Sequence, residues 1–282
     1  MSTAAARWRD QLLARRIPDE ILAAAPESPY GFPAELFVRR ATHAAASELT
    51  PTTEEAIAAL HPEGSVLDVG CGGGATSLPL ASGVSAIAGV DAQEDMLEAF
   101  AAAWAEAGLD ATTIQGSWPD IGSSAPEADV VVCGHVLYNV ADAAPFVATL
   151  GRHARRRVVL ELTVRHPIAW MEDLWQRFHG LGWPAGPTAD DAAELISDLG
   201  LDVHRRDRET EGDRGGGGFD RREDAVALVR RRLCLPPERD DEIVDGLGPR
   251  LREHDGLWSA GPGDQTVATL WFDVPGSGAA RT

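Results

Sequence analysis

Between residues 65 and 164 the chain alternates short apolar runs with helix-like stretches. Five runs rich in β-branched and other apolar residues are predicted to be strands: 65–69, 85–90, 111–115, 129–133 and 158–163. Three stretches between them are predicted to be helices: 76–81, 94–107 and 143–152. Continuous apolar strands that alternate with crossover helices are typical of a parallel sheet covered on both faces. The pattern therefore predicts a doubly wound α/β domain.

Residues 4–60 precede this domain and have the apolar spacing of helices. Pro and Gly residues predict a loop over 28–33, and helical signals return over 33–49 and 52–60. Thr52 or Thr53 is a candidate N-cap of the last helix. This part of the chain is therefore predicted to be a helical extension.

After residue 164 the alternation is looser. The elements expected there are a helix over 169–179, a helix over 190–199, a strand over 201–206, a flexible glycine-rich loop over 210–220, helical stretches over 223–235 and 239–252, and a last strand over 266–274. The helical pair between the last two strands is expected to form a cap.

Charge and composition exclude several classes of function. The chain has 44 acidic residues and 25 basic residues, and its net charge is −19. All of the basic residues are arginines. Such a surface repels phosphate backbones, so we expect no nucleic-acid partner and no anionic membrane partner. The absence of lysine excludes Schiff-base and Walker-type mechanisms. Because no run approaches the ~18 apolar residues of a membrane helix and no signal-peptide pattern begins the chain, we expect a soluble cytoplasmic protein.

The strongest chemical signal is the run 66–74, Val-Leu-Asp-Val-Gly-Cys-Gly-Gly-Gly, at the end of the first predicted strand. Glycines let the backbone turn sharply and let a ligand approach its amide groups. Asp91 ends the second predicted strand, 21 residues after Gly70, where a carboxylate can accept both ribose hydroxyls of a nucleoside. The combination predicts a nucleoside cofactor. Gly70, Gly72 and Ala75 also satisfy the dinucleotide pattern, which keeps an NAD(P)-dependent oxidoreductase as an alternative.

The motif Asp68-x-Gly70-x-Gly72-x-Gly74 resembles the first motif of class I S-adenosylmethionine-dependent methyltransferases, and the resemblance extends over residues 62–164. It implies S-adenosylmethionine as cofactor and S-adenosylhomocysteine as product, with Asp68 near the methionine amino group. Many members place an Asp near position 117, where this chain has Ser followed by Trp. The cofactor-binding residues implied are Asp68, Gly70, Cys71, Gly72, Gly74, Asp91, Ala92, Met96, Ser117, Trp118, Cys133 and His135.

The same resemblance implies a seven-stranded, mainly parallel sheet with an N-terminal helical extension and a C-terminal helical cap. The expected division is an extension over 1–60 and a methyltransferase domain over 61–282. Within the domain we expect the cofactor core at 62–164, the cap and substrate-side elements at 165–260, and the last strand at 266–274.

The loop after the fourth strand carries the candidate catalytic residues, His135 and Tyr138. Methyl transfer from a sulfonium is an in-line displacement, so a base is needed only when the acceptor must lose a proton. His135 suits that role, and the alternative is that it packs against the methionine part of the cofactor. Glu161 and His166 are further base candidates, and Glu161 could equally be a buried structural carboxylate.

The segments outside the core are expected to define the acceptor. Tyr30 and Phe32 are candidates to cover the cofactor mouth. Four aromatic residues either line a substrate pocket or form a packed core: Trp170, Trp175, Phe178 and Trp183. The arginine runs at 155–157 and 230–232 favour solvated faces. No metal-site spacing occurs, and we expect methyl transfer to a small organic molecule, with a non-catalytic cofactor-binding relative as the alternative.

Overall fold

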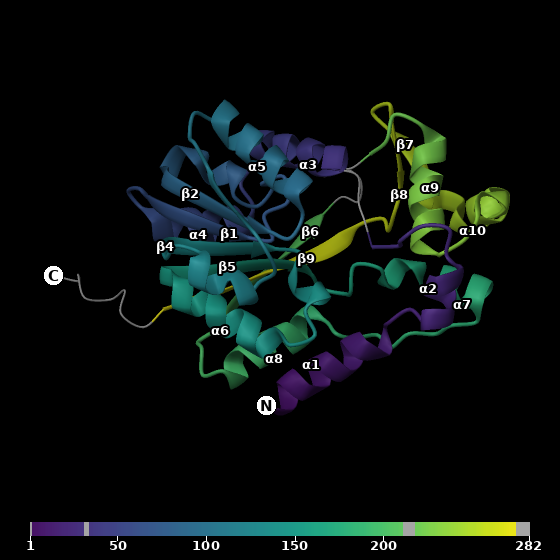
Figure 1. Cartoon of the computed structure of the whole chain (residues 1–282), viewed down its shortest axis with the longest axis horizontal. Helices are drawn as coiled ribbons and strands as arrows, with labels where there is room; N and C mark the ends of the chain where they lie inside the picture. The colour runs from purple at the N-terminus through teal and green to yellow at the C-terminus, as the bar shows by residue number, and fades with distance from the viewer. Residues whose placement is uncertain (1, 31–33, 211–217, 275–282) are drawn as a thin grey trace.

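The computed structural model describes residues 2–30, 34–210 and 218–274, and its centre is a seven-stranded sheet of order β3-β2-β1-β4-β5-β9-β6 (Figure 1). Its strands are β1 (Gly64–Val69), β2 (Val84–Asp91), β3 (Thr112–Gln115), β4 (Ala128–Gly134), β5 (Ala154–Thr163), β6 (His204–Thr210) and β9 (Gln265–Asp273). Strand β9 runs antiparallel to both of its neighbours, while β1 to β5 pair in parallel. The predicted doubly wound, mainly parallel sheet is confirmed.

The central strands are buried on both faces. Leu67 of β1 and Val131 of β4 point to one face, whereas Val66 and Val130 point to the other, and all four are at most 1% exposed. This explains why these strands have continuous apolar runs instead of alternating ones.

Helices cover both faces of the sheet (Figure 1). One face carries α4 (Pro51–Leu60), the 3₁₀ helix η1 (Leu78–Gly83) and α5 (Glu94–Glu106), and α3 (Ala34–Ala46) packs on α5 and η1. The other face carries α6 (Ala143–His153) and α8 (Ala189–Asp198), and α1 (Thr3–Ala14) packs on both of them. The N-terminal extension is thus integrated into both helical layers.

A third apolar cluster forms the cap at one end of the sheet (Figure 1). It consists of α7 (Glu172–His179), α9 (Arg222–Arg232), α10 (Asp240–Leu247) and the hairpin of β7 (Leu251–His254) and β8 (Leu257–Ala260), and α2 (Asp19–Ala24) from the extension lies against it. Of these elements, α9, α10 and the hairpin lie between β6 and β9 in the chain, whereas α7 lies between β5 and β6, so the cap is built from more than one segment.

Several local predictions were wrong. The helix expected to reach residue 252 ends at Leu247, because 251–260 form a hairpin turned by Asp255 and Gly256 at positive φ. The stretch 76–81 forms a 3₁₀ helix instead of an α-helix. The strand expected at 201–206 begins at His204. Most of the predicted glycine-rich loop, 211–217, lies outside the described residues.

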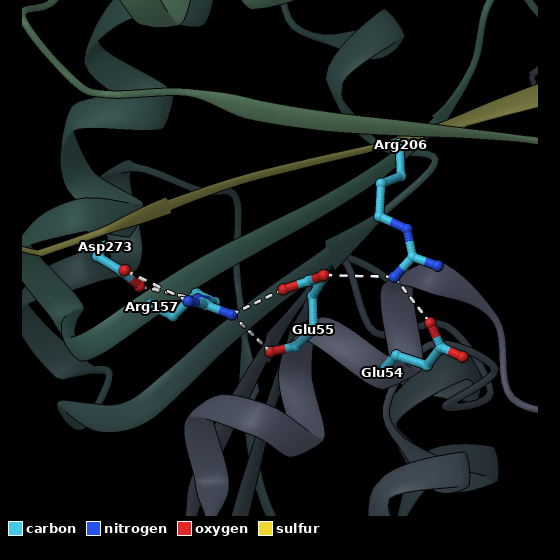
Figure 2. A network of polar contacts seen from close by, with 5 residues as sticks. All are labelled: Glu54, Glu55, Arg157, Arg206 and Asp273. Atoms are coloured by element: carbon cyan, nitrogen blue, oxygen red, sulfur yellow. Dashed lines mark hydrogen bonds and ion pairs between the residues drawn. The ribbon is translucent and has the colours of Figure 1, made fainter.

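Helix α4 is fixed to the sheet by an ion-pair network (Figure 2). Arg157 of β5 lies between Glu55 and Asp273, at 2.8 Å from a carboxylate oxygen of each. Arg206 of β6 pairs with Glu54 at 2.7 Å and reaches Glu55. Arg157 therefore does not lie on the solvated face expected for its run. Among the described helices, none has the length and apolar character needed to cross a membrane.

Candidate active site

The glycine turn follows β1 directly. Gly70, Gly72 and Gly74 have φ values of 72°, 49° and 89°, which disfavour residues with a side chain. The amides of Gly70 and Cys71 donate to the carbonyl of Val90 at 2.8 and 3.1 Å. A Cβ on Gly70 would lie 2.3 Å from Cγ2 of Val136, so the turn packs tightly against the loop after β4. These glycines are required by the backbone and by this close approach.

Asp91, at the end of β2, holds the glycine turn in place. Its Oδ2 accepts a hydrogen bond from the Gly72 amide and its Oδ1 accepts one from the Gln93 amide, both at 3.0 Å. Each carboxylate oxygen can accept a further hydrogen bond. Asp91 therefore combines the predicted position at the strand end with a structural role in the turn.

Asp68, beneath the turn, is a buried carboxylate without a donor. It is 1% exposed, and neither oxygen accepts a hydrogen bond from a described residue. Burial raises the pKa of Asp68 to about 7, and the nearby charge of Asp91 adds to this rise. The Ser77 hydroxyl lowers the pKa in part, although it does not form a full hydrogen bond with the carboxylate. An orphaned carboxylate of this kind fits a ligand that brings a cation and hydrogen-bond donors.

Helix α3 covers the turn from above. A Cβ on Gly72 would lie 3.1 Å from the ring of Phe37. A Cβ on Gly73 would lie 2.8 Å from the carbonyl oxygen of Phe37. The Arg40 guanidinium lies 5.8 Å from the Phe37 ring centroid, and burial lowers the pKa of Arg40. Among the described residues, Arg40 has no carboxylate partner. The sequence carries no signal for this residue, because its placement depends on the packing of α3.

The element observed against the glycine turn is α3, and the covering role expected of Tyr30 and Phe32 stays a prediction. Tyr30 is 63% exposed, and Phe32 lies outside the described residues.

His135 and Glu161 form a dyad at the adjoining ends of β4 and β5. His135 Nε2 lies 3.0 Å from Glu161 Oε1, and the His135 amide donates to the Glu161 carbonyl at 2.7 Å. The His135 side chain is 48% exposed, and Nδ1 has no hydrogen-bond partner among the described residues. His135 adopts φ 59°, a conformation uncommon for a residue with a side chain. The sheet thus presents one imidazole nitrogen toward solvent and the other toward a carboxylate.

A hydroxyl pair supports the dyad from behind. Thr52 donates to Glu161 Oε2 at 2.5 Å, and its hydroxyl lies 2.7 Å from that of Thr269. Thr52 is therefore not the N-cap of α4, a role that Thr50 has by accepting from the Thr53 amide. Burial alone would raise the pKa of Glu161, but the hydrogen bond and charge of His135 and the Thr52 hydroxyl outweigh burial and hold the pKa below its ordinary value.

Comparison with known proteins assigns the central segment of the chain. Residues 66–157, which contain the turn, Asp91 and His135, match the family model of the methyltransferase domain. This segment is a methyltransferase domain. The resemblance to class I S-adenosylmethionine-dependent methyltransferases is confirmed there, although the match covers only the central part of the chain.

Individual relatives match this chain over parts of their length. The chain is 36% identical over 103 residues to an uncharacterized protein of Haemophilus influenzae, covering 36% of this chain and 38% of that protein. It is 25% identical over 148 residues to the ubiquinone biosynthesis O-methyltransferase of Rickettsia canadensis, and this match covers 49% of this chain and 62% of that protein. The matches thus span less than two thirds of either relative.

Among solved structures, a cyclopropane-fatty-acyl-phospholipid synthase-like protein of Lactobacillus casei superposes with a TM-score of 0.51 and 17% identity. The superposition covers 90% of this chain and 98% of that one. At this identity the likeness concerns the fold alone.

Tyr138, a candidate catalytic residue, has its side chain in the core and not at the surface of the site, which speaks against the catalytic role predicted for it. The side chain is 3% exposed, stacks on Trp8 at 5.6 Å and donates its hydroxyl to the Thr163 carbonyl at 2.7 Å. Burial raises the pKa of its phenol. His166 is also unsuited to act as a base, because burial and the charge of Arg15 lower its pKa to about 3.

The remaining predicted cofactor residues differ in accessibility. The side chains of Cys71, Met96 and Cys133 are buried in the cores that flank the turn, and burial raises the pKa of both thiols. Ala92 and Ser117 are exposed. Trp118 is directed toward α6, where its Nε1 donates to the Phe146 carbonyl at 3.3 Å. The adenine-stacking role of Trp118 therefore stays a prediction.

The four aromatic residues of the cap pack in an apolar core, which is one of the two alternatives that the sequence left open. Trp175 is 1% exposed and packs against Trp183, with ring centroids 4.7 Å apart. Trp170 and Phe178 pack against the same cluster. The described residues include no cluster of three or more His, Cys, Asp or Glu side chains that could hold a metal.

Proposed function

We propose that this protein transfers a methyl group from S-adenosylmethionine to a small organic acceptor, at the edge where β1, β2, β4 and β5 end. The observation that carries the proposal is the orphaned carboxylate of Asp68 beneath a glycine turn, beside an accessible His–Glu dyad. Ligands of open α/β sheets bind outside the carboxyl ends of the strands. Both features lie at that edge.

The residues around the turn match the chemistry of the cofactor. Asp68 would accept the methionine ammonium, whose charge and N–H groups satisfy both of its oxygens. Asp91 would accept the ribose hydroxyls with its remaining lone pairs. Arg40, a desolvated cation without a carboxylate partner in the described chain, would pair with the methionine carboxylate. When bound, the cofactor supplies a methyl group on a positively charged sulfur.

The His135–Glu161 dyad would remove the proton from the acceptor. Nδ1 of His135 is the nitrogen available to a substrate. Glu161 holds the imidazole ring in place and stabilises the imidazolium that forms when His135 takes up the proton. Thr52 and Thr269 keep Glu161 in place. Similarity to ubiquinone biosynthesis O-methyltransferases favours a hydroxyl oxygen as the atom that is methylated. The acidic surface and the cap favour a small molecule over a nucleic acid.

The test is a panel of hydroxylated small molecules incubated with S-adenosylmethionine, with S-adenosylhomocysteine release as the readout. We expect turnover by the wild type and a loss of about 100-fold in His135→Gln, with unchanged cofactor affinity. His204→Gln is the matched control, because His204 is also half-exposed and lies 3.8 Å from a carboxylate, that of Asp202. Equal turnover by both variants would refute the role of His135, and a wild type that binds no cofactor would refute the function.

A further inference from the structure

Arg208 of β6 is one of a few arginines whose side chain has no ion pair with a described residue, and it lies near the carboxyl end of its strand. Acidic residues outnumber basic ones by 44 to 25, and the neighbouring Arg205 and Arg206 each contact two carboxylates. Arg208, which is half-buried, has no hydrogen bond and no ion pair in the described part of the chain. In so acidic a protein, an arginine without a carboxylate calls for a reason.

The sheet register places Arg208 on the face that carries the dyad. Glu161, Thr269 and Arg206 lie opposite one another across β5, β9 and β6, and Thr163, Val267 and Arg208 form the next row toward the carboxyl edge. Directly opposed residues share a face, as do residues two apart in one strand. Since neighbouring strands lie about 4.8 Å apart, Arg208 is about 10 Å across the sheet from β5, within reach of a small molecule held at His135.

Charge and topology place Arg208 beside the proposed acceptor position. The Arg208 charge contributes to the lowered pKa of Glu161, after the larger effects of burial, His135 and Thr52. The strand that carries Arg208 ends at Thr210, and the next helix of the described chain is α9 of the cap. Arg208 therefore lies near the carboxyl end of β6, on the face of the sheet that carries the dyad.

We infer that the acceptor carries an acidic group, a carboxylate or a phosphate, which pairs with Arg208 while the hydroxyl to be methylated faces His135. This inference rests on the proposed function and adds the chemical class of the substrate. A guanidinium forms bidentate, charge-assisted hydrogen bonds with either anion. The anion would also supply the partner that Arg208 lacks within the described residues.

The experiment uses the full chain saturated with S-adenosylhomocysteine, titrated calorimetrically with matched probes. The probes are benzoate and benzamide, hexanoate and hexanamide, and phenyl phosphate. They are compared in the wild type, Arg208→Gln, Arg208→Lys and Arg165→Gln, and circular dichroism checks the fold. Arg165 is the matched control, because it is an exposed arginine at the same edge of the sheet, and its side chain also has no hydrogen bond or ion pair among the described residues.

We expect at least one acid to bind at least tenfold more tightly than its amide. The preference should fall about tenfold to a hundredfold in Arg208→Gln, persist in part in Arg208→Lys and remain in Arg165→Gln. Whether a carboxylate or phenyl phosphate binds more tightly identifies which anion the site prefers. Equal binding of acids and amides, no binding of any acid, or loss of the preference in Arg165→Gln alone would overturn the inference. If S-adenosylhomocysteine itself does not bind, the proposed function fails first and the inference fails with it.

Discussion

Asp68→Asn should stabilise the protein without ligand and weaken cofactor binding. The wild-type carboxylate is 1% exposed and accepts no hydrogen bond from the described residues, so its charge is costly in the fold. Asparagine has nearly the same shape and carries no charge. The same carboxylate is the proposed partner of the methionine ammonium. The substitution should therefore raise the stability of the ligand-free protein and lower its affinity for the cofactor.

The magnitude follows from the two pKa values. In the unfolded chain Asp68 ionises near its ordinary pKa of 3.8, whereas in the fold burial raises the pKa to about 7. Between these values the folded state binds more protons than the unfolded state, so stability falls as pH rises, and the loss is complete above about pH 7. At about 1.4 kcal/mol for each pH unit, the interval from 3.8 to about 7 corresponds to about 4 kcal/mol.

The assay is denaturant unfolding of both proteins at pH 4, 6 and 8. We expect similar stabilities at pH 4 and a gain that grows to as much as about 4 kcal/mol for Asp68→Asn at pH 8. Asp129→Asn is the control of opposite sign. Burial opposes ionisation of Asp129, but hydrogen bonds from Ser65 and the charges of Arg156 and Arg155 outweigh burial and lower its pKa. That variant should therefore be less stable at pH 8.

Cofactor binding gives the second half of the test. In the wild type, affinity for S-adenosylmethionine should rise as pH approaches 7, because the ammonium favours ionised Asp68, and should level off above it. Asp68→Asn should bind at least tenfold more weakly at pH 8, without this pH dependence. A variant that is destabilised at pH 8, or that binds the cofactor as the wild type does, would refute the reasoning.

Three other substitutions test separate parts of the site. Glu161→Gln should reduce kcat about tenfold to a hundredfold and shift the pH profile, with cofactor affinity measured by calorimetry unchanged; an unaltered profile would contradict its positioning role. Gly70→Ala forces a side chain onto φ 72° and toward Val136, so unfolding should show a loss on the order of 1–3 kcal/mol, together with weaker cofactor binding. Tyr138→Phe loses the bond to the Thr163 carbonyl, so it should cost about 1 kcal/mol of stability and leave kcat within threefold, whereas a larger fall in kcat would restore its catalytic assignment.

The sequence was most informative where local pattern and global structure coincide. Central parallel strands are buried on both faces, so their apolar runs are unambiguous, and the glycine turn has φ values that few other residues adopt. The short strands of the 251–260 hairpin were missed because four-residue strands with polar positions do not differ enough from the end of a helix.

The site was harder to predict because its contacts join distant segments. Thr52 and Glu161 are 109 positions apart, and nothing local to either residue indicates their hydrogen bond. Tyr138 is three positions from His135, yet it lies within the 3₁₀ turn Leu137–Asn139, and its ring packs in the core on Trp8. Arg40 and Arg208 have no ion pair among the described residues, and only a folded structure reveals this.

The central claim is that the turn beside Asp91 binds S-adenosylmethionine. Calorimetric titration with S-adenosylmethionine, S-adenosylhomocysteine and NAD tests it most directly, using the wild type, Asp91→Ala and, as a matched control, Asp95→Ala in the first turn of α5. We predict micromolar binding of the first two ligands, at least tenfold weaker binding in Asp91→Ala, unchanged binding in Asp95→Ala, and no binding of NAD. Binding of NAD in place of S-adenosylmethionine, or cofactor binding that Asp91→Ala leaves unaltered, would contradict it.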